Sequence, residues 1–188
     1  DQDVPHCFSV SGVMELPLGK NKPFLSASHP VASRLVGGWQ IAGIWGYQVG
    51  LPLQWNNPGA TLCCIYYGDP KDILLPAGQR TVDHWVNTAG FERASANQLV
   101  SNQLRTWPLR FSQIRGRNAN NVDLALTKNT RLKEGKDIQF RAEALNALNH
   151  PGFPAPVLVP ASASFGKIVA SNQAGYPRRL QLMLKYIF

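Results

Sequence analysis

The C-terminal residues, 180–188, alternate strictly between apolar and mixed positions. In an extended strand, successive side chains point to opposite faces, so every second residue shares a face. One face of this segment is formed by large apolar side chains, namely Leu180, Leu182, Leu184, Tyr186 and Phe188. The other face carries Gln181, Met183, Lys185 and Ile187. The apolar face has to be covered by lipid or by a protein core.

The alternation of this segment fits two structures. One is the terminal, half-buried strand of a soluble sheet, and the other is a strand of an outer-membrane β-barrel, which is apolar outward and polar inward. A barrel strand that ends at the periplasmic interface places an aromatic residue in the aromatic girdle. The aromatic C-terminus therefore favours the barrel.

Length and hydropathy leave both structures open, since 188 residues with 44% hydrophobic content can supply a core or several membrane strands. No stretch approaches the roughly 18 consecutive apolar residues of a transmembrane helix, so a membrane protein of this sequence is a barrel. The chain starts with Asp1-Gln2-Asp3 and has neither an initiator Met nor an apolar signal segment. We expect it to be part of a longer protein.

The charge and cysteine patterns are less specific. The net charge is +8, from 19 Lys and Arg against 11 Asp and Glu, but the basic residues are scattered, so we expect no nucleic-acid partner. There are three cysteines, and a bridge between the neighbours Cys63 and Cys64 would strain the backbone. The sequence therefore predicts no disulfide framework.

Alternation predicts five strands, over 8–16, 39–54, 121–132, 137–149 and 178–188. The second is the longest, and one of its faces carries Trp39, Ile41, Trp45, Tyr47 and Val49, which we expect to face lipid or to lie in the aromatic girdle. Residues 142–149 also suit a helix. A strand is favoured there because the short turn at 133–136 joins two alternating runs.

Two long segments, 56–120 and 151–177, lack periodicity. Irregular segments of this length are unusual in a compact soluble domain, whereas barrels carry long extracellular loops and short periplasmic turns. If the C-terminus is periplasmic, strand alternation places both long segments outside and the connectors 17–38 and 133–136 inside. The sequence thus predicts an all-β fold, an antiparallel transmembrane β-barrel segment of about five C-terminal strands that is incomplete on its own.

Several motifs follow one another along the chain: ELPLGK at 15–20, GGWQIAG at 37–43, VGLPL at 49–53, WVNTAGF at 85–91 and FRAEALNALNHPGF at 140–153. Together with the terminal strand and Phe188, their order resembles the C-terminal barrel region of TonB-dependent outer-membrane receptors of the Oar-like type. The resemblance spans nearly the whole chain. Cys7 and the Cys63-Cys64 pair depart from the family pattern.

The resemblance implies a receptor in the outer membrane of a Gram-negative bacterium that transports a bulky solute. It implies as partners the TonB system, acting through an N-terminal plug that this chain lacks, the outer-membrane lipid and the barrel-assembly machinery. We expect that machinery to recognise Leu180, Leu182, Leu184, Tyr186 and Phe188 as a C-terminal signal. The resemblance implies no cofactor, no metal and no catalytic residue.

Two other functions fit parts of the sequence. A soluble all-β module could bind a ligand or a carbohydrate through Trp55, Trp85 and Trp107. An enzyme would have to use Asp83-His84, His150 or the Cys63-Cys64 pair, and a metal site would have to combine His6, Cys7 and that pair. These groups lack the spacing of a zinc site or a nucleophile motif, so we expect no enzyme.

Overall fold

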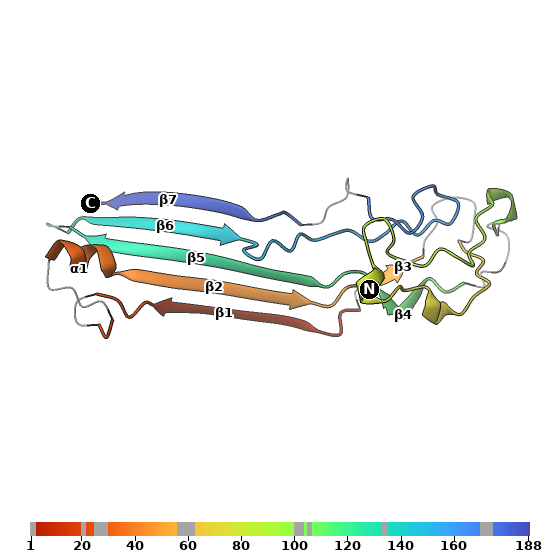
Figure 1. Ribbon diagram of the computed structural model, residues 1–188, viewed down its shortest axis with the longest axis horizontal. Helices are drawn as coiled ribbons and strands as arrows, with labels where there is room; N and C mark the ends of the chain where they lie inside the picture. The colour runs from red at the N-terminus through yellow and green to blue at the C-terminus, as the bar shows by residue number, and fades with distance from the viewer. Residues whose placement is uncertain are drawn as a thin grey trace. The chain divides into compact units, whose positions relative to one another are not determined.

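Five antiparallel strands form one sheet in the order β1-β2-β5-β6-β7 (Figure 1). They are β1 Cys7–Glu15, β2 Trp39–Gln48, β5 Ala119–Arg131, β6 Asp137–Leu145 and β7 Arg179–Ile187. The computed structural model describes residues 3–19, 22–24, 30–55, 63–99, 104, 107–132, 135–169 and 175–188. Within these residues the outer edges of β1 and β7 have no partner strand, so the sheet is not closed.

The chain divides into two compact units, which we describe separately. The sheet unit comprises His6–Gln48, Ala119–Pro151 and Tyr176–Phe188. The loop unit comprises Asp1–Pro5, Val49–Asn118 and Gly152–Gly175. The segment expected as one long loop over 56–120 therefore belongs mostly to a folded unit of its own.

The strand bounds differ from the sequence prediction by one or two residues at most ends and by more in two places. The strand expected over 39–54 is interrupted, because β2 ends at Gln48 and residues Pro52–Gln54 form a separate short strand, β3, in another sheet. The strand expected over 137–149 ends at Leu145. Hydrogen-bonded turns follow it, so the helix that was considered for 142–149 does not form.

Two asparagines end β6 and join it to its neighbours. Asn146 and Asn149 both have positive φ, 50° and 54°, a conformation that asparagine tolerates better than most residues. The Asn146 Nδ2 donates to the carbonyl of Tyr176 at 2.8 Å, and its Oδ1 accepts from the backbone N–H of His150 at 2.8 Å. Its own N–H donates to Asp123 Oδ1 at 2.8 Å. Asn146 thus ties β5, through Asp123, to the residues that follow β6 and precede β7.

The opposite rim of the sheet contains a helix and a tight turn. Helix α1, Pro30–Val36, lies in the connector between β1 and β2, where the sequence had predicted only a connection. Lys128 of β5 donates to three carbonyls at the end of this helix, those of Arg34, Leu35 and Gly37, at 2.9, 2.9 and 2.6 Å. Gly135, with φ of 76°, makes the turn between β5 and β6. No helix among the described residues combines the length and apolar character needed to cross a membrane.

The loop unit has its own hydrophobic core. A two-stranded sheet pairs β3 with β4, Arg110–Arg115, and three 3-10 turns follow the chain at η1 Pro70–Asp72, η2 Ala77–Gln79 and η3 Ser95–Asn97. Trp55 stacks on Phe91 at 5.4 Å between ring centroids and meets the edge of Trp107 at 5.7 Å. Phe165, from the second long segment, packs on Phe91 at 5.1 Å. The two long segments therefore fold against each other.

The three tryptophans proposed for carbohydrate binding are buried in this unit. Trp55 is fully buried, and Trp85 and Trp107 are each 8% exposed. Their rings contribute to packing instead of forming an exposed binding platform. The structure therefore does not support a carbohydrate site formed by these three tryptophans.

The cysteine prediction also needs correction. Cys63 and Cys64 form a disulfide, both are buried in the loop unit, and Cys63 has a positive φ of 74°. The bridge between neighbours exists, and the backbone strain that the sequence predicted for it is found at Cys63, whose positive φ is uncommon for a residue other than glycine. Cys7 is a free, exposed thiol on β1.

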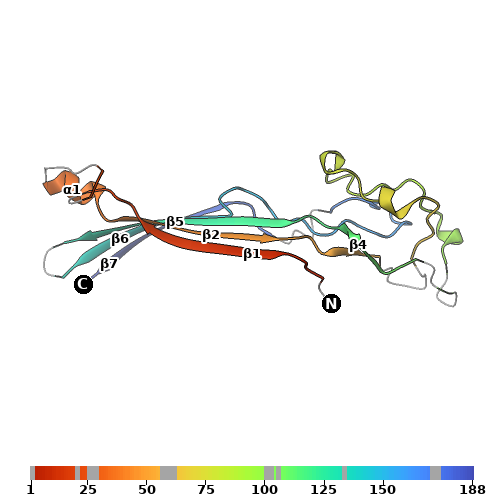
Figure 2. The same ribbon diagram turned by 90° about the horizontal axis from the view of Figure 1, so that it is seen from below.

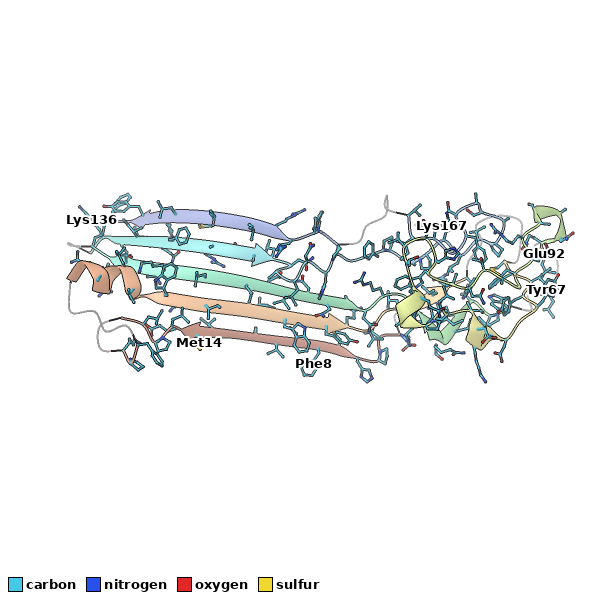
Figure 3. The ribbon with its side chains drawn as sticks, viewed as in Figure 1. Phe8, Met14, Tyr67, Glu92, Lys136 and Lys167 are labelled. Atoms are coloured by element: carbon cyan, nitrogen blue, oxygen red, sulfur yellow. A yellow bond between two sulfur atoms is a disulfide. The ribbon has the colours of Figure 1, made fainter. Side chains whose placement is uncertain are left out.

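Glu92 organises the turn that follows Phe91. Its carboxylate accepts from the Ala94 N–H at 2.8 Å and from Asn97 Nδ2 at 3.2 Å, and the Tyr67 hydroxyl lies at 3.5 Å (Figure 3). The Ala94 hydrogen bond, followed by the Asn97 bond, holds the pKa of the Glu92 carboxyl below its usual range. The carboxylate is thus kept ionised as a local turn stabiliser.

Replacing Asn146 tests the rim described above. Asn146→Ala removes two side-chain hydrogen bonds, each worth about 0.5–1.5 kcal/mol. Alanine also tolerates a positive φ less well than asparagine, which costs about 1 kcal/mol more. We expect a loss of about 2–4 kcal/mol in the free energy of unfolding, measured by urea titration of the protein in lipid vesicles. Asn146→Gly should be less destabilising, because glycine tolerates the positive φ. Wild-type stability of Asn146→Ala would contradict this role.

Candidate functional site

The sheet presents one almost entirely apolar face. Residues paired across antiparallel strands lie on the same face, so the register defines the face across all five strands. On this face β1 contributes Phe8, Val10, Gly12 and Met14; β2 Trp39, Ile41, Gly43, Trp45 and Tyr47; β5 Asn120, Val122, Leu124, Leu126, Lys128 and Thr130; β6 Ile138, Phe140, Ala142 and Ala144; and β7 Leu180, Leu182, Leu184 and Tyr186. Figure 3 labels Phe8 and Met14 on β1.

The opposite face is predominantly polar. It carries Cys7, Ser9, Ser11, Val13 and Glu15 of β1; Gln40, Ala42, Ile44, Gly46 and Gln48 of β2; Ala119, Asn121, Asp123, Ala125, Thr127, Asn129 and Arg131 of β5; Asp137, Gln139, Arg141, Glu143 and Leu145 of β6; and Arg179, Gln181, Met183, Lys185 and Ile187 of β7. An ion pair between Arg141 and Glu143 at 2.5 Å lies on it. A face of this composition is suited to water.

Among the residues that the structure describes, the sheet unit has no second layer over its apolar face. Seen edge-on, the five strands form a single twisted layer (Figure 2). Among the described residues every buried hydrophobic side chain belongs to the loop unit, whereas Leu180, Leu182 and Leu184 are 77%, 73% and 73% exposed. A contiguous apolar surface of this width is not stable in water and marks contact with lipid or protein.

Aromatic side chains lie toward both ends of the apolar face. Phe8, Trp45 and Tyr47 lie toward the end from which the loop unit's segments leave, and Trp39, Phe140 and Tyr186 toward the α1 end. Between Trp39 and Tyr47 the strand rises about 26 Å, or about 20 Å once tilted as barrel strands are. The apolar band of an outer-membrane barrel is about 25 Å tall and is flanked by aromatic girdles. The two rows therefore match such a band.

Two of these aromatic rings are anchored by hydrogen bonds. Trp45 Nε1 donates to Asn120 Oδ1 at 2.9 Å, and Trp39 Nε1 donates to the carbonyl of Leu35 in α1 at 3.1 Å. The Lys128 ammonium lies 5.0 Å from the Trp39 ring centroid. Each indole thus has an apolar body and a satisfied polar atom, as residues at a membrane interface require.

The terminal strand, β7, lies at one edge of the sheet, and its apolar side chains are exposed. β7 pairs with β6 along its whole length, from Arg179 opposite Leu145 to Ile187 opposite Asp137. The Tyr186 and Phe188 rings stack at 5.9 Å, and Phe188 is 94% exposed. The five residues predicted as an assembly signal therefore remain accessible in this unit, and recognition by the assembly machinery stays a prediction.

The structure places most of the predicted lipid-facing residues together. Trp39, Ile41, Trp45 and Tyr47 share the apolar face, and their contact with lipid stays a prediction. Val49 lies past the end of β2, in the loop unit, so it is not on the sheet's apolar face. Phe8 and Phe140 were not among the predicted residues, although their alternate positions in the expected strands could have identified them.

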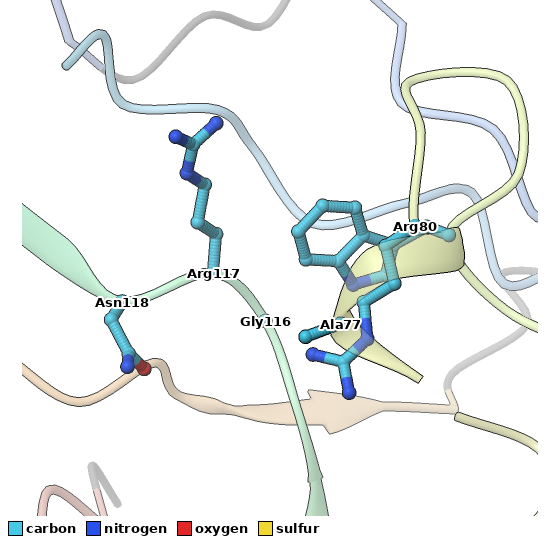
Figure 4. A pocket seen from close by; sticks show the side chains of 6 residues that line it. Ala77, Arg80, Gly116, Arg117 and Asn118 are labelled. Atoms are coloured by element: carbon cyan, nitrogen blue, oxygen red, sulfur yellow. The ribbon is translucent and has the colours of Figure 1, made fainter. Parts of the chain in front are cut away.

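The loop unit contains a cavity of about 450 Å³ lined by Ala77, Arg80, Trp85, Gly116, Arg117 and Asn118 (Figure 4). One wall comes from η2 and the residues after it, and the other from the segment that follows β4. The second wall is held in place because the Gly50 N–H donates to Asn118 Oδ1 at 2.9 Å and the Gly116 N–H to the Leu51 carbonyl at 2.9 Å. None of the sequence motifs had indicated this cavity.

The groups considered for catalysis or metal binding have other surroundings. Asp83 lies 4.0 Å from the Lys167 ammonium, and the N–H of His150 belongs to the Asn146 rim. The disulfide occupies both Cys63 and Cys64. In the described ranges, no group of three or more His, Cys, Asp or Glu side chains is placed to hold a metal ion.

Comparison with known proteins agrees with this geometry. A family model described as outer membrane beta barrel domain matches residues 1–181. The chain therefore belongs to this family, and its location is the outer membrane of a Gram-negative bacterium. Neither a curated protein nor a solved structure matches the chain significantly.

Arginine substitutions on neighbouring residues of β5 test which face contacts lipid. Leu126 lies on the apolar face near the middle of the strand, and Ala125 lies on the polar face. Leu126→Arg should lower the free energy of unfolding by about 2–4 kcal/mol in lipid vesicles, because a charge at mid-membrane depth is costly. Ala125→Arg, the matched control, should change it little. Equal effects of the two substitutions would contradict the assignment of faces.

Proposed function

We propose that this chain forms part of the barrel wall and the extracellular loops of a TonB-dependent outer-membrane receptor, of the Oar-like type, that transports a bulky solute. The main support is the five-stranded sheet, apolar on one face and polar on the other, combined with the ordered motifs at 15–20, 37–43, 85–91 and 140–153. Five strands are fewer than the eight of the smallest barrels, and receptors of this class have about 22. The sheet is therefore one sector of a larger wall.

Strand direction supports the sidedness of this proposal. The chain leaves the sheet from one rim to build the loop unit, and at the other rim lie the α1 connector and the Gly135 turn. Outer-membrane barrels have long extracellular loops and short periplasmic turns. In this arrangement the loop unit is extracellular and Phe188 is periplasmic.

The proposed role is not catalytic. The sheet forms part of the wall between lipid and lumen, and the loop unit presents a folded surface to the exterior. The TonB system would act through an N-terminal plug, and the barrel-assembly machinery would insert the complete chain. A soluble binding module is less favourable, because its proposed aromatic platform is buried and its sheet would expose a wide apolar face to water.

The TonB part of the proposal is tested on the complete gene and its product. The upstream reading frame should encode a signal peptide, a plug and further alternating strands. The purified full-length protein should then bind the periplasmic domain of TonB in a pull-down, and a variant without the N-terminal TonB-binding segment should not. A signal peptide directly before Asp1, or equal capture of both proteins, would contradict TonB-dependent transport.

Removal of Phe188 tests the predicted assembly signal. We expect its deletion to lower the amount of the full-length protein in outer-membrane fractions, because the terminal aromatic residue is lost from the apolar face. Lys185→Ala on the opposite face of β7 is the matched control and should leave this amount unchanged. Heat-modifiable mobility in gels and immunoblots of membrane fractions provide the measurement. Normal outer-membrane levels after deletion would contradict the signal.

A further inference from the structure

We infer that the cavity in the loop unit binds a small organic anion through the guanidinium groups of Arg80 and Arg117. Its lining contains two arginines, one asparagine and no acidic residue (Figure 4). Its volume, about 450 Å³, lies in the range of small-molecule sites, roughly 300–1,000 Å³. The inference concerns binding alone and does not depend on TonB-dependent transport.

Two other arginines of the loop unit, Arg115 and Arg93, have structural roles and provide a comparison for the arginines of the cavity. Arg115 pairs with Asp3 at 2.5 Å and donates to the carbonyls of Gly50 and Ser112. Arg93 donates to the carbonyls of Pro160 and Ser162, each at 3.3 Å. Both guanidinium groups hold separate segments together through oxygen acceptors.

The cavity arginines lack such acceptors. Arg117 lies with its guanidinium carbon 5.1 Å from the Phe153 ring centroid, and within the described part of the chain no oxygen accepts from it. Arg80 donates through Nε to the Leu75 carbonyl and lies 5.9 Å from the Trp85 ring, so its side chain is positioned while both terminal nitrogens are unused among the described residues. No described carboxylate pairs with either group.

Guanidinium groups without a counter-charge favour oxyanions, and here Arg80 is partly buried while Arg117 is exposed and extends away from it (Figure 4). The planar fork of a guanidinium matches the two oxygens of a carboxylate or of a phosphate and makes charge-assisted hydrogen bonds to them. The Trp85 ring adds an apolar wall against which the carbon skeleton of a ligand can lie. The chemistry therefore selects a small organic molecule with a carboxylate or phosphate group over a neutral molecule of the same size.

Three hexoses that differ in one group test this selection. Calorimetric titrations use the full-length protein, purified from outer membranes in detergent, with glucose, glucuronate and glucose 6-phosphate as probes. We expect binding of glucuronate, of glucose 6-phosphate or of both, and none of glucose. Binding of one anion alone identifies the head group as carboxylate or phosphate. Equal binding of all three hexoses, or no binding of either anion at millimolar concentration, would overturn the inference.

Substitutions locate the binding in the cavity. Arg117→Ala should weaken anion binding at least about tenfold, the loss expected for one charge-assisted contact. Arg117→Lys should lose less, because the positive charge is kept. Lys71→Ala removes one positive charge from η1 of the same unit and should leave binding unchanged. Unchanged affinity of an Arg117→Ala protein with wild-type urea unfolding would overturn the inference, while the TonB pull-down would be unaffected.

Discussion

Continuous backbone pairing of five antiparallel strands is the interaction on which the rest of this structure depends. In hydrocarbon every unpaired backbone N–H and C=O costs several kcal/mol, so a strand can cross a membrane only if its neighbours satisfy it. The unbroken register from β1 to β7 provides this pairing and aligns alternate side chains on two faces. One continuous apolar surface results, and no described part of the chain forms a protein layer over it. The chain belongs to the outer membrane beta barrel domain family, so we expect lipid to cover that surface.

The rims of the sheet show how the chain leaves this regular structure without losing hydrogen bonds. At one rim Asn146 supplies both amide atoms to backbone groups, and at the other Lys128 supplies its ammonium to the last carbonyls of α1. Both residues are polar groups placed where pairing between strands ends. Asn146 thus accounts for one of the polar residues in the motif at 140–153, where the alternation of β6 ends.

The loop unit is stabilised by other means. Its core joins residues from two segments far apart in the sequence, such as Phe91 and Phe165, and it includes the buried disulfide of Cys63 and Cys64. A folded unit of this kind can hold a cavity in fixed geometry. This makes a ligand site on the loops physically reasonable, because side chains such as Arg80 are positioned before any ligand arrives.

The sequence by itself determined the strands and their two faces, because alternation with a period of two is a local property of an extended backbone. Trp39, Ile41, Trp45 and Tyr47 could be grouped from spacing alone, but the end of β2 before Val49 could not, since that depends on the pairing of β3 with β4. Only the tertiary structure decided that Trp55 and Trp107 are core residues, and that Arg117 lines a cavity while Arg115 pairs with Asp3. Contacts between residues distant in the sequence leave no periodic pattern in it. The loop unit therefore could not be predicted from the sequence, whereas the sheet could.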